Sequence, residues 1–211
     1  MSAAAFRAAM ARRPLVAILR GVEPGEVEAI GEALVDAGFT LIEVPLNSPE
    51  PFESLERLAR RLGDRAVVGA GTVLAVADVA RVKDAGGAMV VSPNTDPAVI
   101  GAVVAAGMAC LPGFLTPGEA FAALAAGATA VKLFPAEASS PAALGAMRAV
   151  LPKAALLLPV GGITPGAMAP WRAAGADGFG LGGALYRKGD AAADVARAAR
   201  AFIHALEQEP P

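Results

Sequence analysis

The sequence predicts an α/β protein built as a (β/α)₈ barrel, also called a TIM barrel, with a short N-terminal helix. Three observations predict it: Ala-rich helical segments end repeatedly on Ala-Gly, a short apolar run follows these pairs, and polar residues stand where the runs end. Glycine directly after a helix is a C-cap signal. The pairs are Ala37-Gly38, Ala85-Gly86, Ala106-Gly107, Ala126-Gly127 and Ala174-Gly175.

The apolar runs indicate buried parallel strands. They are continuous rather than alternating, which is typical of strands covered on both faces by crossover helices. Strands that alternate with helices indicate a parallel sheet, and eight such units predict a barrel. The expected strands are Leu15–Leu19, Thr40–Val44, Ala66–Gly69, Ala88–Val91, Met108–Leu111, Ala128–Leu133, Ala155–Pro159 and Gly178–Leu181.

The residues after two strands distinguish the barrel from an open doubly wound sheet. The open sheet would carry a Gly-rich nucleotide turn after its first strand. Here that strand leads into Arg20-Gly21-Val22, and Gly69-Ala70-Gly71 lacks the third glycine of a dinucleotide fingerprint. We therefore prefer the barrel, with Pro159 at the end of its strand because proline cannot donate to the ladder.

Composition indicates one domain over residues 1–211, since the chain is 55% hydrophobic and 18% charged. A net charge of -2 provides no basic surface for nucleic acid. Charge, glycine or proline interrupts every apolar stretch before the roughly 18 residues that a membrane helix needs. Residues 1–13 contain three arginines and no long apolar core, which predicts an amphipathic helix rather than a signal peptide. We expect a cytoplasmic protein.

Two residue types are almost absent, and this narrows the chemistry. Cys110 is the only cysteine, so no disulfide framework exists and a small buried thiol is expected. His204 is the only histidine and is expected on the solvent side of a helix. One histidine cannot build a His-rich metal site or plausibly anchor a catalytic triad. The groups left to carry a reaction are therefore carboxylates, lysine amines and backbone N–H groups.

Lys132 is expected to carry chemistry because its amine lies in an apolar run, Ala128 to Phe134. Burial lowers a lysine pKa, and a neutral amine can attack a carbonyl group to form a Schiff base. Glu43 is a carboxylate in another apolar strand, which lies opposite that of Lys132 in an eight-stranded barrel, so the two groups are expected to meet. A lysine that reaches the strand end, or a buried structural ion pair, would explain the same residues without catalysis.

The glycine pairs Gly161-Gly162 and Gly182-Gly183 follow the seventh and eighth strands, where barrels of this kind often bind phosphate. Their backbone N–H groups can bind an anion, although tight turns alone also need glycine. Thr164 and Pro165 predict a helix start, with Thr164 as N-cap. The expected substrate is a phosphorylated sugar acid.

Three further side chains are candidates for substrate contact. Arg20 would bind a carboxylate or phosphate through two hydrogen bonds, and Thr72 would hold a second carboxylate oxygen. Phe134 shares a face with Lys132 by strand alternation and would cover its amine. Surface positions for Arg20 and Thr72, and core packing for Phe134, are the simpler explanations.

Five segments of the chain form a recognisable set. They are Ile42-Glu43-Val44, Gly69-Ala70-Gly71-Thr72-Val73-Leu74, Ser92-Pro93-Asn94, Val131-Lys132-Leu133-Phe134-Pro135-Ala136 and Gly161-Gly162-Ile163-Thr164-Pro165. Together they resemble the KDPG/KHG aldolase family, from about Leu15 to Phe202. The resemblance implies a class I aldolase, usually a homotrimer of (β/α)₈ barrels, that uses no cofactor and no metal ion. In it Lys132 forms the Schiff base and Glu43 is the general acid and base.

The resemblance further implies a phosphorylated 2-oxo-3-deoxy sugar acid as substrate, cleaved to pyruvate and glyceraldehyde 3-phosphate. The implied substrate contacts are Arg20, Thr72, Pro93, Phe134, Val160, Gly161, Gly162, Gly182 and Gly183.

Several positions favour the galactonate configuration of that substrate. The chain has Asn47 where gluconate-specific relatives have an arginine, and it supplies Arg20 instead. The segments most similar to the galactonate branch are Ala17-Ile18-Leu19-Arg20-Gly21, Glu43-Val44-Pro45-Leu46-Asn47-Ser48-Pro49, Trp171 and Leu185-Tyr186-Arg187. Gluconate relatives also have threonine at Val160, and family members commonly have serine at Gly183, so one phosphate hydrogen bond would be lost here.

Two alternatives stay open at this point. Inside the family, the substrate would be the gluconate epimer or 4-hydroxy-2-oxoglutarate. Outside it, a metal-free barrel isomerase or a non-catalytic sugar-phosphate-binding protein would use the same glycine pairs and carboxylate, and would form no covalent adduct with pyruvate.

Overall fold

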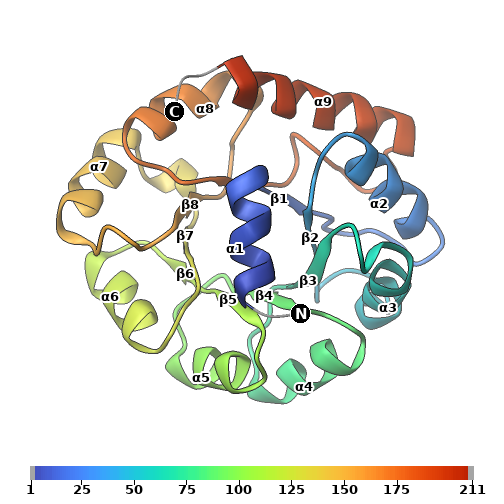
Figure 1. The fold of residues 1–211 in the computed structure, drawn as a ribbon, viewed down its shortest axis with the longest axis horizontal. Coiled ribbons are helices and arrows are strands. Elements are labelled where there is room, and N and C mark those ends of the chain that lie inside the picture. The colour runs from blue at the N-terminus through green and yellow to red at the C-terminus, as the bar shows by residue number, and fades with distance from the viewer. Residues whose placement is uncertain (1–2, 209–211) are drawn as a thin grey trace.

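The computed structural model describes residues 3–208, in which strands and helices alternate along the chain (Figure 1). Neighbouring strands in its sheets run parallel, and the connection between successive paired strands contains a helix. The strands are β1 (Leu15–Ile18), β2 (Leu41–Pro45), β3 (Val67–Gly71), β4 (Met89–Val91), β5 (Ala109–Leu111), β6 (Gly113–Phe114), β7 (Val131–Leu133), β8 (Leu157–Pro159) and β9 (Phe179–Leu181). The predicted class, α/β with a parallel sheet, is confirmed.

The longer helices surround the strands, and the first helix crosses the centre of the view (Figure 1). The helices are α1 (Ala3–Arg12), α2 (Val27–Asp36), α3 (Pro51–Leu62), α4 (Val76–Asp84), α5 (Pro97–Ala105), α6 (Pro117–Ala125), α7 (Pro141–Val150), α8 (Met168–Ala173) and α9 (Ala192–Gln208), with short 3₁₀ turns η1 (Ala136–Ala138) and η2 (Pro165–Ala167). The predicted N-terminal helix is confirmed over Ala3–Arg12; Met1 and Ser2 lie outside the described residues.

The strands form two curved sheets rather than the single closed sheet that the sequence predicted. One has the order β5-β4-β3-β2-β1-β9 and the other the order β6-β7-β8. Pro112, which has no N–H group, follows the expected fifth strand and separates β5 from β6. Hydrogen bonds cross both gaps between the sheets: Lys132 N–H donates to Pro112 O (2.9 Å), and Val160 bridges Gly180 in parallel.

The Ala-Gly pairs end helices as the sequence predicted. All five glycines have positive φ, from 75° at Gly107 to 105° at Gly38. An L-residue adopts this conformation at a cost, whereas glycine does not. The glycine N–H groups donate to the preceding helical turn, as in Gly38 N–H to Val35 O (2.9 Å). Each helix therefore stops where the next buried strand must begin.

The interior enclosed by the strands forms its own apolar cluster, separate from the one between strands and outer helices. Its members include Val16, Leu41, Met89 and Leu158 from the strands, together with Phe6 from α1. Helix α1 reaches the start of β7, where Arg7 Nη2 donates a hydrogen bond to Thr129 O (3.3 Å), just before that strand. Helix α1 thus covers the end of the interior that lies away from the carboxyl ends of the strands.

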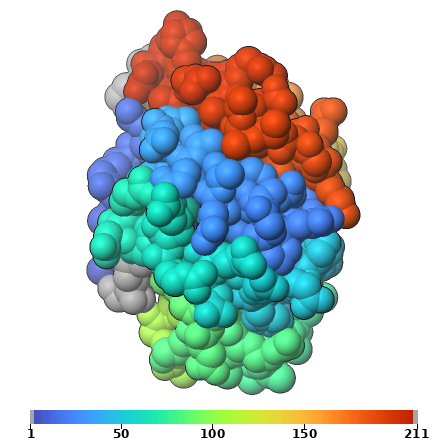
Figure 2. Space-filling view, turned by 90° about the vertical axis from the view of Figure 1, so that its right-hand side faces the viewer, coloured from blue at the N-terminus to red at the C-terminus, as the bar shows by residue number. Residues whose placement is uncertain are grey.

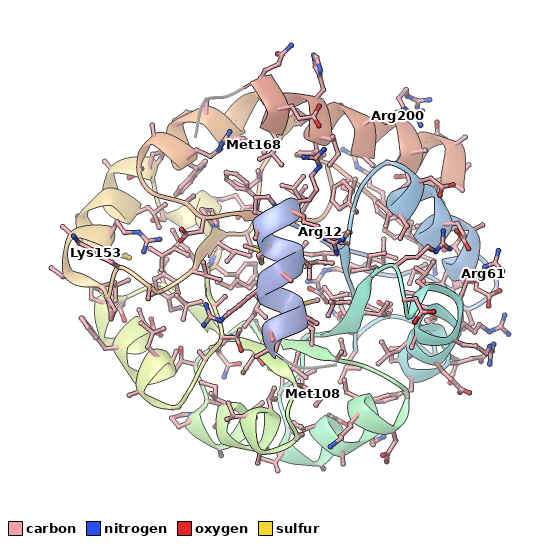
Figure 3. All side chains as sticks on the ribbon, in the orientation of Figure 1. Arg12, Arg61, Met108, Lys153, Met168 and Arg200 are labelled. Atoms are coloured by element: carbon pink, nitrogen blue, oxygen red, sulfur yellow. The ribbon has the colours of Figure 1, made fainter. Side chains whose placement is uncertain are left out.

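The outer face is built from neighbouring helices whose charged side chains point to solvent. Figure 2 shows α9, α2, α3 and α4 in succession along one side, and α2 contacts both α9 and α3. Arg61, Lys153 and Arg200 lie on the outside of the ring (Figure 3). Within residues 3–208, none of the helices has the length and apolar character that crossing a membrane would require.

Candidate active site

Lys132 and Glu43 lie on opposite sides of the strand-lined interior and are almost fully buried. Lys132 stands on β7 and is 5% exposed, and Glu43 stands on β2 and is 2% exposed. Both line one small cavity, whose other lining residues are Val16, Ile18, Val91, Leu111, Leu158, Val160 and Gly180. The structure thus brings both side chains to one cavity, as the strand order predicted.

The environment of Glu43 disfavours its charged form. In the part of the chain that the structure describes, its Oε2 atom is buried and has no hydrogen-bond partner, and no ion pair of 4.0 Å or less joins it to Lys132. Burial raises the pKa of the Glu43 carboxyl to about 7, and the nearby charges of Lys132 and Arg20 oppose this rise only in part. A carboxyl with this pKa is present in both protonation states near neutral pH, as an acid and base requires.

The environment of Lys132 favours its neutral form. Burial lowers the pKa of the amine; the charge of Glu43 opposes this change, and that of Arg20 adds to it. The Nζ atom lies 4.4 Å from the centroid of the Phe134 ring, so the expected cover of the amine is present. Phe134 is half-buried and also lines a larger pocket next to the cavity. A buried neutral amine under an aromatic ring is suited to attack on a carbonyl carbon.

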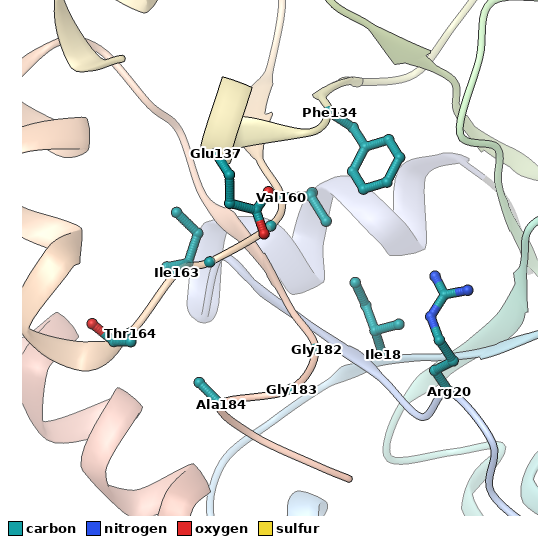
Figure 4. A pocket seen from close by; sticks show the side chains of 12 residues that line it. Ile18, Arg20, Phe134, Glu137, Val160, Ile163, Thr164, Gly182, Gly183 and Ala184 are labelled. Carbon is teal, nitrogen blue, oxygen red and sulfur yellow. The ribbon is translucent and has the colours of Figure 1, made fainter. Parts of the chain in front are cut away.

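The larger pocket has a volume of about 370 Å³ and opens at the carboxyl ends of β1, β8 and β9. Figure 4 shows its lining side chains. The lining residues are Ile18, Arg20, Phe134, Glu137, Val160, Gly161, Gly162, Ile163, Thr164, Gly182, Gly183 and Ala184. Ile18 and Val160 line the small cavity as well, so the two spaces adjoin.

Both predicted glycine pairs reach this pocket. Gly161 and Gly162 have φ values of 116° and 64°, which an L-residue adopts only with strain. Within the described residues, no hydrogen bond uses the backbone N–H groups of Gly161, Gly162 or Gly183. Unpaired N–H groups that face a pocket are suited to bind an anion such as a phosphate group.

The predicted helix start after the first glycine pair takes a different form. Pro165 begins the 3₁₀ turn η2, which leads into α8, and the Thr164 side chain makes no capping hydrogen bond. Thr164 holds the predicted N-cap position and Pro165 the first position of the turn, so the predicted start is confirmed, but as a 3₁₀ turn and without a side-chain cap. Thr164 lines the pocket instead.

Arg20 reaches the pocket from the end of β1 and is held there by the segment after β2. Its Nη1 atom donates to Asn47 Oδ1 (3.2 Å), and the neighbouring Gly21 N–H donates to Ser48 Oγ (2.9 Å). The guanidinium group is exposed and keeps further donors for a ligand. Asn47 and Ser48 therefore position the one cationic side chain that lines the pocket.

Two of the expected contacts lie outside both spaces. Thr72, which follows β3, and Pro93, which follows β4, are half-buried and line neither the cavity nor the pocket. Thr72 is one of two non-glycine residues with positive φ in the described chain, at 55°. Backbone strain of this kind is found preferentially at functional sites, so Thr72 remains a candidate substrate contact.

The sequence analysis did not foresee the roles of three side chains in or beside the pocket. Glu137, in η1, lines it, and Arg187 Nε donates to Gly183 O (2.9 Å), which fixes the second glycine pair. Asn47 was considered only as a replaced arginine, and its bond to Arg20 was not foreseen. For Glu137 the available signal was its place in the loop directly after the strand of Lys132.

Cys110 and His204 lie where the sequence analysis expected them. Cys110 is buried, and burial raises the pKa of its thiol to about 12; His204 is exposed on α9. Within residues 3–208, no three or more histidine, cysteine, aspartate or glutamate residues are grouped as a metal site would need.

Comparison with known proteins identifies the family. A sequence model of the KDPG and KHG aldolase family matches residues 6–200. A protein of Rhizobium meliloti (strain 1021), named "probable 2-dehydro-3-deoxy-6-phosphogalactonate aldolase", is 47% identical over 92% of both chains. The 2-dehydro-3-deoxy-6-phosphogalactonate aldolase of Escherichia coli (strain K12) is 44% identical over 92% of this chain and 95% of its own.

A solved structure agrees with this result. The structure described as native KDPGal has a TM-score of 0.91 and 44% sequence identity over 92% of this chain and 95% of its own. On the strength of the family match and of relatives 44–47% identical over nearly their whole length, the chain belongs to the KDPG and KHG aldolase family of carbon–carbon lyases.

Proposed function

We propose that the protein is a class I aldolase that cleaves 2-dehydro-3-deoxy-6-phosphogalactonate to pyruvate and glyceraldehyde 3-phosphate. The observation that carries this proposal is the buried pair of Lys132 and Glu43 in a cavity that adjoins a glycine-lined pocket. The names of the two relatives support the choice of substrate.

The first half of the reaction forms the Schiff base. The neutral Lys132 amine attacks the C2 ketone of the substrate, and the resulting carbinolamine loses its hydroxyl group as water after Glu43 donates a proton to it. The product is a cationic imine between Lys132 and C2. The pKa of about 7 at Glu43 supports this role, because the carboxyl can both give and take a proton near neutral pH.

The second half breaks the carbon–carbon bond. The Glu43 carboxylate accepts the proton of the C4 hydroxyl, the C3–C4 electron pair moves into the imine, and glyceraldehyde 3-phosphate leaves. The enamine of pyruvate that remains on Lys132 is protonated at C3, and water then hydrolyses the imine to release pyruvate and the free amine. Imine formation and aldol cleavage each run in both directions, so the reaction is reversible, and no external oxidant or reductant enters.

The pocket supports an orientation for the substrate. The phosphate group would lie at Gly161, Gly162, Gly182 and Gly183, whose N–H groups can donate hydrogen bonds to an anion. Arg20, held by Asn47, would bind a charged oxygen of the substrate. Val160 lines both spaces and would place an apolar contact near C4 in the position where gluconate relatives have threonine.

We also propose the architecture, oligomeric state and location of the protein. Hydrogen bonds across both gaps between the sheets support one closed (β/α)₈ barrel that forms a single domain. We propose a homotrimer from the resemblance to the family; Leu74, Val76 and Phe121 are exposed large apolar side chains that an interface would cover. The proposed location is the cytoplasm. Sedimentation of the purified protein tests the trimer, and a monomer would contradict it.

Cleavage of the two purified C4 epimers tests the function and its substrate. We expect release of pyruvate and glyceraldehyde 3-phosphate from both, with a higher kcat/KM on the galactonate epimer. A higher kcat/KM on the gluconate epimer would overturn the substrate assignment and keep the aldolase. Absence of pyruvate release from either epimer and from 4-hydroxy-2-oxoglutarate would overturn the function itself.

A further inference from the structure

Glu137 places a carboxylate inside the pocket that the glycine pairs form. Figure 4 shows its side chain directed into the pocket beside Val160 and Ile163, with Arg20 on the other side. A Cβ atom added at Gly161 would overlap the Glu137 carboxylate, and one added at Gly162 would lie 2.8 Å from Glu137 Cγ. The carboxylate therefore occupies space directly over the backbone that is suited to bind a phosphate group.

Nothing holds this carboxylate in place. Among the described residues, Glu137 takes part in no side-chain hydrogen bond and no ion pair, and its side chain is exposed. It belongs to the short turn η1, so its side chain can rotate toward solvent without disturbing a strand. The Glu137 carboxylate can thus turn away from the glycine pair when a ligand enters.

The charge of Glu137 opposes a phosphate group in this pocket. Of the twelve residues that line it, Arg20 and Glu137 are the ones with ionisable side chains, and their charges oppose each other. A phosphate group at Gly161 and Gly162 would meet the Glu137 carboxylate at close range, where like charges repel strongly. Either the carboxylate moves away or the phosphate group binds less tightly.

We propose that Glu137 is an anionic gate of the phosphate pocket and a determinant of affinity for the phosphorylated end of the substrate. Its carboxylate lies over the glycine pair, must turn outward when a phosphate group binds, and so weakens the binding of phosphorylated ligands. A lower affinity for the phosphate group favours release of the phosphorylated aldehyde after cleavage. The inference rests on the proposed function, because it assigns the phosphate group of that substrate to this pocket.

Calorimetric titration with inorganic phosphate tests the gate directly. Glu137→Gln removes the charge and keeps the shape, and we expect it to bind phosphate about three- to tenfold more tightly than the wild type. Asp84→Asn is the matched control, because it makes the same change in net charge at an exposed site on α4 outside the pocket. The control should bind phosphate as the wild type does.

Ionic strength supplies a readout that a structural role would not move. The difference between Glu137→Gln and the wild type should shrink as salt is added, because salt screens repulsion between partly exposed charges. In turnover, the KM of the phosphorylated substrate should fall in Glu137→Gln in parallel with the dissociation constant of phosphate. Equal or weaker phosphate binding by Glu137→Gln would overturn the gate, as would an equal gain in Asp84→Asn.

Proton exchange at the methyl group of pyruvate separates failure of the gate from failure of the function. Pyruvate carries no phosphate group, so exchange in heavy water reports the enamine on Lys132 without the gated pocket. Exchange by the wild type with unchanged phosphate affinity in Glu137→Gln would overturn the gate alone. Absence of exchange would overturn the aldolase assignment, and the phosphate titration would still decide the gate.

Discussion

The carboxylate of Glu43 packs against the backbone of Gly71, so closely that a Cβ atom at Gly71 would overlap it. Strand register produces this contact: Glu43 pairs with Gly69 across β2 and β3, and Gly71 lies two residues further on the same face. The space that glycine leaves is therefore filled by the proposed catalytic group. Position 71 controls where that carboxylate can stand.

Gly71→Ala should impair catalysis by displacing the Glu43 carboxylate. Gly71 does not have positive φ, so alanine can adopt the backbone without strain there. We expect the cleavage rate to fall toward that of Glu43→Gln, which should lose about 10²- to 10⁴-fold as proposed acid and base. Steady-state kinetics of both variants measures this. Adding Glu43→Asp to Gly71→Ala should recover part of the rate, and wild-type turnover in Gly71→Ala would contradict the account.

Glu43→Gln should stabilise the fold at alkaline pH. The pKa of Glu43 is raised in the folded protein from an ordinary 4.5 to about 7, so folding favours its protonated form. Its stabilising contribution is thus present below about pH 4.5 and is lost as the pH rises through 7. The change corresponds to at most about 3 kcal/mol, at about 1.4 kcal/mol for each pH unit.

Unfolding by denaturant at two pH values checks this expectation. At pH 8 the variant should have the larger free energy of unfolding, and below about pH 4.5 the two proteins should agree, because glutamine resembles the protonated carboxyl. A variant that is less stable than the wild type at pH 8 would show that the carboxylate is paired rather than merely buried.

Asn47→Ala should weaken substrate binding through Arg20. The hydrogen bond from Arg20 to Asn47 is exposed, so its loss should raise KM by about two- to fivefold and leave kcat largely unchanged. The double variant with Arg20→Ala shows whether Asn47 affects KM through Arg20 or directly. If Asn47 acts through Arg20, the asparagine change adds nothing once the arginine is gone, whereas a further full rise in KM would assign Asn47 a contact of its own.

Gly183→Ser should strengthen phosphate binding. A Cβ atom added at Gly183 would meet nothing within 4 Å, and its φ is not positive, so serine fits without strain. The hydroxyl group would supply the hydrogen bond that relatives with serine at this position are expected to make. We expect the dissociation constant of inorganic phosphate to fall about three- to tenfold. Unchanged affinity would mean that the phosphate group binds away from the second glycine pair.

Local patterns allowed much of the fold to be predicted. The continuous apolar runs and the glycines after helices are local signals, and each predicted strand has a counterpart in the structure. The break of the sheet at Pro112 was not expected, although the proline is visible in the sequence. Whether the ladder resumes after such a break depends on the neighbouring strand, here β7, and not on local sequence.

The site was predictable where strand order alone places a residue. Opposite strands bring Lys132 and Glu43 into one interior, and a barrel places the glycine pairs at one end. Glu137 was not foreseen, because only the path of η1 brings it over Gly161. The contact of Glu43 with Gly71 depends on register, which continuous apolar runs without alternation do not specify.

Borohydride reduction in the presence of pyruvate, followed by peptide mapping, tests the central claim most directly. We expect one reduced pyruvate adduct per chain, confined to the peptide that contains Lys132, and none in Lys132→Met, whose side chain has a similar volume. Lys83, Lys153 and Lys188 serve as internal controls, because all three are exposed. Absence of an adduct, or an adduct on one of these three lysines, would contradict Schiff-base catalysis at Lys132.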